Sequence, residues 1–414
     1  MLTQADSRLV ESSFKKYYLE KADTVYVPER ISEREFGYFT FQERIMVRHL
    51  YIDSPEKLRE FLVKNNPLHV YHSLAFYKYP SAPMEEKEWM GAELAFDIDA
   101  DHLKTPCKGK HDFKVCPKCF TAYSTQKEVC SNCGGALIDS EWICELCLES
   151  AKQETLKLLD FLEEDLGFKN LKVAFSGNRG YHVVVKDEEI SELGQIERKE
   201  IVDYITGTGI SMRLMGLVED TVKGKALKIR GPDISDPGWR GRIARASIQL
   251  ALRADPIEFS ELTSTSYKLA DKCAAILRQF SEEWSERCAW DLLPRNVVKL
   301  LAKAAVNHAS AKIDVVVTSD IHRLIRLGNT INGKSGLLAR VIDIDELEDF
   351  DPFLQTVVLP YDKMVEVRVL KAPKFRMLGE EYGPLENTMA KLPMAVAIFL
   401  ILKNLATVSK PYAL

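Results

Sequence analysis

The sequence of 414 residues lacks an apolar run long enough to cross a membrane. Its longest, Met394 to Leu402 between Lys391 and Lys403, is far shorter than the roughly 20 residues that a membrane-spanning helix requires. We interpret this run as a buried helix. Met1 to Val25 carries charges throughout, which is not the pattern of a signal peptide. We therefore expect a cytoplasmic protein with no membrane partner.

The sequence also has little net charge. Its 56 basic and 61 acidic side chains leave a net charge of -5, which does not itself indicate a nucleic-acid-binding protein. Between Ser211 and Arg253, however, nine Lys or Arg stand against four Asp or Glu. A solvated basic face is the ordinary interpretation of such a stretch. A surface that follows the phosphates of a template strand is the sharper one.

Cysteine is scarce outside one segment, because seven of the nine lie between Cys107 and Cys147. In a reducing compartment such clustering indicates metal binding rather than disulfides. Two CxxC pairs separated by a short loop predict a zinc ribbon, and its ligands are Cys116, Cys119, Cys130 and Cys133. Four flanking residues would complete a second zinc site, namely Cys107, His111, Cys144 and Cys147.

We therefore expect two structural zinc ions in a nested arrangement, with an inner Cys₄ ribbon inserted into the loop of an outer Cys₃His site. The spacing also allows a different pairing, in which one site is formed by Cys107, His111, Cys116 and Cys119 and the other by the remaining four ligands. Closed sites with four protein ligands leave no coordination position for a substrate, so both would be structural.

The segment from Glu93 to Asp99 alternates acidic or small residues with large apolar ones. Side chains two apart on a strand point to the same face, so Asp97 and Asp99 would lie together, opposite an apolar face. Like charges at this spacing repel unless a hard divalent cation such as Mg²⁺ or Mn²⁺ lies between them. We interpret the pair as a metal site, although an acidic solvent face is the ordinary interpretation of an isolated DxD.

Lys172 to Val185 has the pattern of a strand, a glycine-containing turn and a second strand. The turn offers backbone N–H groups, the Ser176 hydroxyl and the Arg179 guanidinium, and His182 follows near the start of the returning strand. These groups suit the β- and γ-phosphates of a nucleoside triphosphate. The alternative is an ordinary hairpin with an arginine at its tip.

Other segments complete the expected organisation. A helix is predicted over 5–22, a strand over 34–41 and a helical lobe over about 255–310, while Ile313 to Thr318 predicts a short strand with Asp314 at its start. Gly328 to Gly336 partly matches GxxxxGK[ST]. We reject a P-loop there, because an arginine-rich, helix-like segment precedes it instead of a buried strand.

The order of these motifs resembles the catalytic small subunit of archaeo-eukaryotic DNA primases, of the archaeal type. The likeness runs from Arg34 to about Gly336 and includes the DxD, the cysteine knuckles, SGxRGxH, the helical lobe, HRLIRL and the KSG loop. It implies an α/β (α+β) fold with a mixed or antiparallel catalytic sheet. The implied boundaries are a catalytic domain over 1–205 and 306–414, a zinc-binding insertion at 107–147 and a mainly helical subdomain at 206–305.

The resemblance also implies which residues act. The family's three carboxylates, which bind two divalent metals, Mg²⁺ or Mn²⁺, match Asp97, Asp99 and Asp314. Its nucleotide-binding residues match Arg34, Ser176, Arg179, His182 and Arg326.

Three positions depart from the family pattern. Asn178 stands where eukaryotic members carry a second arginine, which implies fewer triphosphate contacts. Asn332 stands where a histidine is often found. The ribbon from Cys116 to Cys133 resembles an insertion into the usual single zinc knuckle.

The implied function is that of a DNA-dependent nucleotidyltransferase in DNA replication. It would make short primers of RNA, or of DNA, on single-stranded DNA from nucleoside triphosphates, in a heterodimer with a large iron–sulfur subunit. Two other hypotheses stand beside it. A non-catalytic zinc-ribbon protein that binds nucleic acid would leave the three carboxylates without a role. A repair polymerase of the same fold would need a primer to start.

Overall fold

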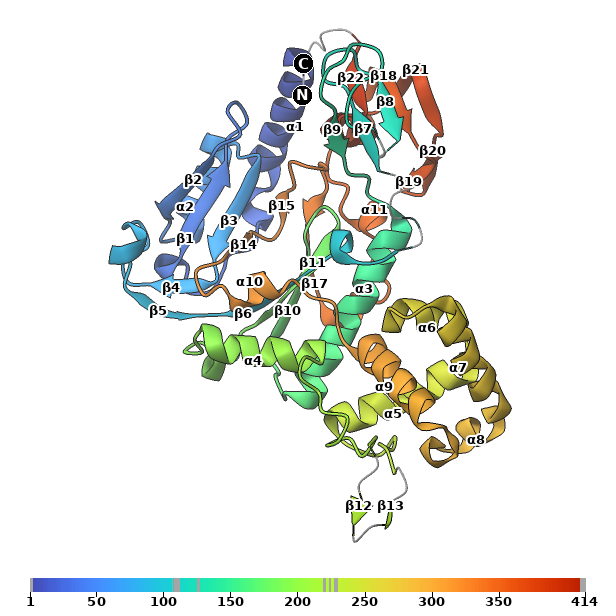
Figure 1. The fold of residues 1–414 in the computed structure, drawn as a ribbon. Coiled ribbons are helices and arrows are strands. Elements are labelled where there is room, and N and C mark those ends of the chain that lie inside the picture. The colour runs from blue at the N-terminus through green and yellow to red at the C-terminus, as the bar shows by residue number, and fades with distance from the viewer. Residues whose placement is uncertain are drawn as a thin grey trace. The chain divides into compact units, whose positions relative to one another are not determined.

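The structure is a computed structural model that describes residues 3–105, 107, 112–124, 127–218, 221–222, 225–226 and 230–409. These residues form helices and antiparallel sheets, which confirms the predicted α+β class (Figure 1). The chain divides into two compact units. The first comprises Met1–Thr155, Asn170–Arg198 and Ile313–Leu414, and the second comprises Leu156–Lys169 and Lys199–Lys312. Within the described ranges, no helix is both long and apolar enough to cross a membrane.

The first sheet of unit 1 has the strand order β14-β3-β1-β2. Its strands are β14 (Leu324–Arg326), β3 (His69–Ser73), β1 (Glu35–Phe39) and β2 (Met46–Tyr51). Two helices pack on the β1 segment, α1 (Gln4–Lys21) and α2 (Pro55–Asn65). Phe14 of α1 meets Phe41 edge-on at 5.2 Å, and Phe61 of α2 meets Tyr38 in the same way at 5.2 Å. The predicted helix over 5–22 is therefore confirmed.

The second sheet of unit 1 has the order β17-β10-β11-β6. Its strands are β17 (Val341–Ile342), β10 (Leu171–Phe175), β11 (Gly180–Val185) and β6 (Leu94–Asp99). β10 and β11 form the predicted strand, turn and strand, with Phe175 opposite Tyr181. Gly180 lies against β6 so closely that a Cβ atom there would be 2.2 Å from the carbonyl oxygen of Ile98. Only glycine allows β11 to approach the acidic strand at this point.

A third sheet in unit 1 places β18 (Met364–Ala372) between β21 (Leu385–Pro393) and β22 (Ala406–Val408). α12 (Met394–Leu402) follows β21, and its residues from Met394 to Ile401 are all buried, which confirms the predicted buried helix. A three-stranded sheet in the cysteine-rich segment has the order β8-β7-β9. Its strands are β7 (Phe113–Val115), β8 (Ala122–Ser124) and β9 (Ile138–Ser140).

Shorter elements complete unit 1. Three strand pairs are formed by β4 (Ala75–Tyr77) with β5 (Trp89–Ala92), β15 (Thr330–Ile331) with β16 (Leu338–Ala339), and β19 (Phe375–Met377) with β20 (Glu380–Tyr382). Two short helices are α10 (Val315–Ser319) and α11 (Pro352–Gln355). Residues of both units occur in α3 (Glu145–Asp160) and α4 (Gln195–Thr206).

The second unit is mainly helical, and the predicted span 206–305 falls within it. Its helices are α5 (Gly238–Arg253), α6 (Pro256–Thr263), α7 (Tyr267–Gln279), α8 (Ser281–Glu286) and α9 (Arg295–Ala309). The helical pattern predicted over 255–310 is thereby confirmed. A small strand pair joins β12 (Thr221–Val222) to β13 (Lys225–Ala226).

Candidate active site

Asp97 and Asp99 lie at the end of β6, two residues apart, as the alternation predicts. In the pairing with β11, His182 stands opposite Asp97 and Gly180 opposite Asp99. The Nε2 atom of His182 is 3.6 Å from Oδ1 of Asp97. The glycine-bearing turn after β10 is therefore held directly beside the acidic strand.

Asp314 reaches the same place from a different kind of element than predicted. The strand expected over Ile313 to Thr318 is wrong, because Val315–Ser319 forms the short helix α10 and Asp314 is its N-cap. Oδ1 of Asp314 accepts a hydrogen bond from the backbone N–H of Val316 at 2.9 Å. An aspartate cap has overridden the strand preference of three successive valines.

The Asp314 backbone N–H donates to the carbonyl oxygen of Asp97 at 2.8 Å, which brings two of the predicted carboxylates together. Burial, with the nearby charge of Asp314, raises the pKa of Asp97 to about 6. In the part of the chain that is described, the only groups with three or more ligand atoms within 4.8 Å of one another are cysteine groups. Asp97 therefore has Asp99 on its own strand and Asp314 in contact with its backbone, but the three carboxylates do not form a closed group of ligand atoms in the described residues.

A cavity of about 340 Å³ opens beside Asp97 and Asp99. Its other polar lining residues are Tyr71, Ser176, Asn178, His182, Arg323, Arg326, Asn332 and Lys334. Carboxylates and cations therefore line the same space, which suits a polyanion that is bound together with divalent metal. Burial and the positive charge of Arg326 lower the pKa of His182 to about 4, so this imidazole is neutral near pH 7.

Arg326 presents a positive charge to this cavity. Its Nη2 donates to the hydroxyl of Tyr71 at 3.0 Å, and its Nη1 lies 2.5 Å from Nδ1 of His69. Burial lowers the pKa of its guanidinium. No carboxylate of the described residues pairs with it, so an anionic ligand would relieve its burial.

Two cations of the cavity were not singled out from the sequence. Arg323 precedes β14, and Lys334 lies in the loop after β15. The sequence signal that could have identified them is the run of basic residues from His322 to Lys334, whose last part overlaps the rejected P-loop match. That loop also positions the turn after β10, because Asn332 donates to the carbonyl oxygen of Ser176 at 2.8 Å and Ser335 donates to that of Gly177.

Arg34, predicted to contact a nucleotide, is directed elsewhere. Its side chain is 1% exposed, and its two Nη atoms bond the carboxylate of Glu93 at 3.0 and 2.7 Å. It also donates to the carbonyl oxygens of Glu29 and Ser73, both at 2.7 Å. The guanidinium therefore holds the start of β1 to Glu93 and to neighbouring backbone, and contact of Arg34 with a nucleotide stays a prediction.

We expect Arg34→Met to lower the free energy of unfolding by about 3 kcal/mol, because Glu93 would remain buried without its partner. Denaturant unfolding measures this loss. Arg30→Met is the matched control, since the ion pair of Arg30 with Glu33 is exposed and contributes roughly 0.5 kcal/mol. An Arg34→Met protein with unchanged stability but a raised KM for nucleotide would instead support the predicted nucleotide contact.

Arg179, predicted to bind triphosphate, does not line the cavity. It is 5% exposed and forms ion pairs with Asp101, with Glu141 at 3.3 Å and with Asp112 at 3.7 Å. Its buried Nε has no hydrogen-bond partner among the described atoms. Asp112 and Glu141 flank the cysteine-rich sheet, so this segment pairs with Arg179 in the structure, and its role in binding triphosphate stays a prediction. Ser176 and His182, by contrast, line the cavity.

The cysteines form two groups. The sulfurs of the inner group, Cys116, Cys119, Cys130 and Cys133, lie within 4.8 Å of one another, as do those of Cys107, Cys144 and Cys147. Contacts of 3.4 Å in the inner group and 3.2 and 3.7 Å in the outer group approach the about 3.8 Å expected for tetrahedral zinc thiolates. This is the nested grouping, and the alternative pairing is not formed. His111 lies outside the described residues.

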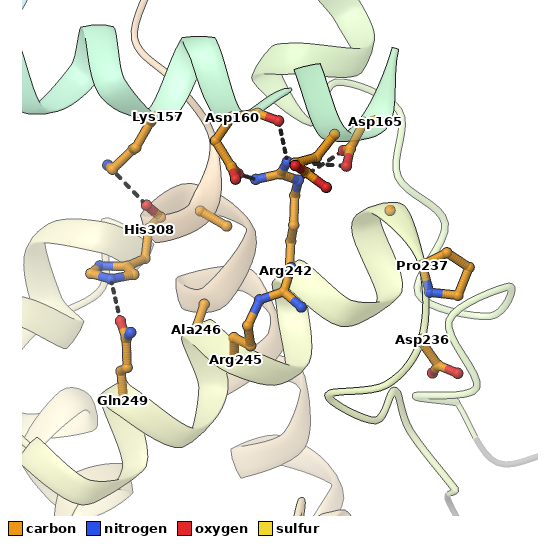
Figure 2. A pocket seen from close by; sticks show the side chains of 13 residues that line it. Lys157, Asp160, Asp165, Asp236, Pro237, Arg242, Arg245, Ala246, Gln249 and His308 are labelled. Carbon is orange, nitrogen blue, oxygen red and sulfur yellow. Dashed lines mark hydrogen bonds and ion pairs between the residues drawn. The ribbon is translucent and has the colours of Figure 1, made fainter. Parts of the chain in front are cut away.

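The second unit contains a larger cavity, of about 620 Å³, to which none of the predicted catalytic residues contributes. Figure 2 shows Arg242 there, bonded to Asp160 and to Asp165, the latter at 2.8 Å. Arg240 likewise pairs with Asp236. Two arginines of the predicted basic surface are therefore paired with carboxylates of the same chain, while Arg230 and Arg245 are exposed. Lys223 and Lys228 lie outside the described residues.

A family model described as "DNA primase small subunit" matches residues 138–344, which is about half of the chain. The matched region contains the turn at Ser176, the cap residue Asp314 and Arg326. The chain belongs to the DNA primase small subunit family.

Curated relatives extend the match to nearly the whole chain. The protein named DNA primase small subunit PriS of Nitrosopumilus maritimus is 34% identical over 411 residues, covering 99% of this chain and 100% of the relative. The PriS of Methanococcoides burtonii is 33% identical and covers 96% and 97%, respectively. That of Cenarchaeum symbiosum is 32% identical and covers 98% and 99%. The resemblance to the archaeal type is confirmed.

Proposed function

We propose that this chain is the catalytic subunit of a DNA primase and joins nucleotides on a single-stranded DNA template. The observation that carries the proposal is a cavity lined both by Asp97 and Asp99 and by cations, with Asp314 hydrogen-bonded to the acidic strand. Such a site suits a nucleoside triphosphate bound together with divalent metal.

Asp97, Asp99 and Asp314 would hold two divalent ions, because hard Mg²⁺ or Mn²⁺ prefers carboxylate oxygen. The raised pKa of Asp97 supports this fit, since a cation between Asp97 and Asp314 would relieve their repulsion. When bound, the two ions supply activation of a 3′-hydroxyl and neutralisation of the leaving pyrophosphate.

The chain's own groups would bind and orient the substrate. Arg326, with Arg323 and Lys334, would hold the phosphates by charge-assisted hydrogen bonds. Neutral His182 would offer one N–H, and the Ser176 hydroxyl would help to fix the turn. Arg179 would join only if triphosphate displaced it from Asp101 and Glu141. No protein group needs to form a covalent intermediate.

We further propose that both cysteine groups hold structural zinc, with His111 as the fourth ligand of the outer group. The natural partners would be single-stranded DNA, nucleoside triphosphates and a large iron–sulfur subunit. A cytoplasmic location and the domain boundaries derived from the sequence remain predictions of the same hypothesis.

The test is synthesis from nucleoside triphosphates alone on a single-stranded template with Mg²⁺ or Mn²⁺. We expect template-dependent products without any added primer. Extension of an added primer without initiation would indicate a repair polymerase of this fold. Template binding with no incorporation would indicate a non-catalytic zinc-ribbon protein. Ribonucleotides and deoxyribonucleotides, offered separately, would identify the sugar that the site accepts.

We expect the inner cysteine ribbon to be dispensable for chemistry, because its four ligands lie outside the residues that line the carboxylate cavity. A variant in which a short linker replaces residues 116–133 should extend a preformed primer within about twofold of the rate of the intact chain. Steady-state extension rates measure this, with circular dichroism as the check on folding. A folded variant that cannot extend a primer would refute the expectation.

A further inference from the structure

A second cavity adjoins the carboxylate cavity within the first unit. It has a volume of about 440 Å³ and shares Tyr71, Arg326 and Lys334 with the first cavity. Neither Asp97 nor Asp99 lines it. Arg326 and Lys334 therefore line both cavities, of which only the first also contains the predicted metal ligands Asp97 and Asp99.

Polar side chains from separate parts of the chain line this second cavity. Arg44 comes from the loop between β1 and β2, His69 from β3, and Lys403 from the residue after α12. Burial and the charge of Arg326 lower the pKa of His69 well below its usual value, so His69 is not a cation near pH 7. Lys403 is 4% exposed, and its Nζ donates to Oδ1 of Asn178 at 2.8 Å. In the described part of the chain, neither Lys403 nor Arg44 has a carboxylate within ion-pair distance. Burial and the charge of Arg179 lower the pKa of Lys403 to about 7.

Two acidic residues also line the cavity, but both already have cationic partners. Asp139 lies 3.7 Å from Nζ of Lys114, and Glu141 lies 3.3 Å from Arg179 and 3.9 Å from Lys334. Among the described residues, Arg44 and Arg326 have no carboxylate partner, and Lys403, when it is protonated, has none within ion-pair distance. A buried lysine without a counter-ion is costly unless an anion binds beside it, and the exposed Arg44 adds positive charge to the lining of the same cavity.

We propose that this second cavity binds a diphosphate anion and receives the pyrophosphate released by the proposed reaction. The proposal rests on the proposed function. Each addition would join the 3′-oxygen to the α-phosphorus and break the bond from that phosphorus to the oxygen that bridges it to the β-phosphorus. The proton of the 3′-hydroxyl passes to solvent, and one pyrophosphate leaves per nucleotide. Arg326 and Lys334 line both cavities and would pass the leaving group from one to the other.

The first experiment measures binding of inorganic pyrophosphate to the whole chain by calorimetry, without added nucleotide. Arg44→Gln and Lys403→Gln should each weaken binding about tenfold, the loss expected of one charge-assisted hydrogen bond. Arg59→Gln, at an exposed position of α2, is the matched control and should bind like the unaltered chain. Because Arg44 lies in an exposed loop, its variant keeps the test valid if the Lys403 variant misfolds. Unchanged pyrophosphate affinity in a folded Arg44→Gln protein would overturn the proposal.

The second experiment measures inhibition of synthesis by added pyrophosphate. Arg44→Gln should raise the inhibition constant about tenfold and change the KM for nucleotide less than about twofold. A parallel rise in the KM for nucleotide would place Arg44 in the substrate site and contradict the proposal. Binding of a nucleotide in the second cavity that pyrophosphate does not displace would also contradict it. Absence of any synthesis would refute the proposed function, and the calorimetric result would still decide the anion site.

Discussion

Replacing Asp314 by asparagine is expected to abolish template-dependent nucleotide incorporation without disturbing the fold. Asparagine is as good an N-cap as aspartate, so α10 keeps its start. The backbone N–H that bonds the carbonyl oxygen of Asp97 is unchanged. The variant loses only one negative charge of the proposed metal site, and the rate should fall on the order of 10³-fold or more, as several kcal/mol of charge stabilisation disappear.

Incorporation of labelled nucleotide on single-stranded DNA measures this loss. Asp97→Asn should behave in the same way, because it preserves shape and removes charge. Asp345→Asn is a suitable control, since Asp345 is exposed and does not line the cavity. Zinc content and thermal unfolding should match the unaltered chain in all three variants. Near-normal incorporation by the Asp314→Asn or the Asp97→Asn protein would rule out a metal role for these carboxylates.

Loss of the outer cysteine group should have the largest effect on stability. Cys144 directly precedes α3, Cys147 lies in its first turn, and both meet Cys107 across about forty residues of chain. Structural zinc contributes folding free energy on the order of 10 kcal/mol. We expect Cys144→Ser with Cys147→Ser to release one zinc per chain and to lower the Tm by more than about 10 °C.

Mass spectrometry of the intact protein and scanning calorimetry measure both quantities. Cys288→Ser is the control, because Cys288 belongs to neither group. The Cys288→Ser protein should retain two zinc ions and a Tm within a few degrees of that of the unaltered chain. The doubly substituted protein should also lose nucleotide incorporation, since Asp112 and Glu141, which hold Arg179, lie in the segment that the outer group secures. A double variant that keeps both zinc ions would show that the group does not bind metal.

Local patterns were enough to predict part of this site. Asp97 and Asp99 follow from alternation along one strand, and Ser176 and His182 follow from a hairpin whose strands are contiguous in the sequence. The element that carries Asp314 was mispredicted because three valines favour a strand, whereas a single cap hydrogen bond and contact with β6 favour a helix.

The two arginines were harder, because their partners are distant in the sequence. Arg34 meets Glu93 and Arg179 meets Asp101, pairs separated by 59 and 78 residues. Nothing near either arginine in the chain indicates such a partner. Likewise Lys403 follows an apolar helix, and only the packing of the C-terminal segment brings it to Asn178. A motif can thus identify a site while leaving open which of its cations are free to meet a ligand.

The tight fit at Gly180 makes one position informative about other genomes. Since the missing side chain lets β11 touch β6, even alanine would force the two strands apart and separate His182 from Asp97. Space next to a backbone carbonyl opens only if the backbone of one of the two strands moves. A related gene that encodes any larger residue there is expected to specify a protein that has lost its enzymatic role, even if every acidic residue is still present.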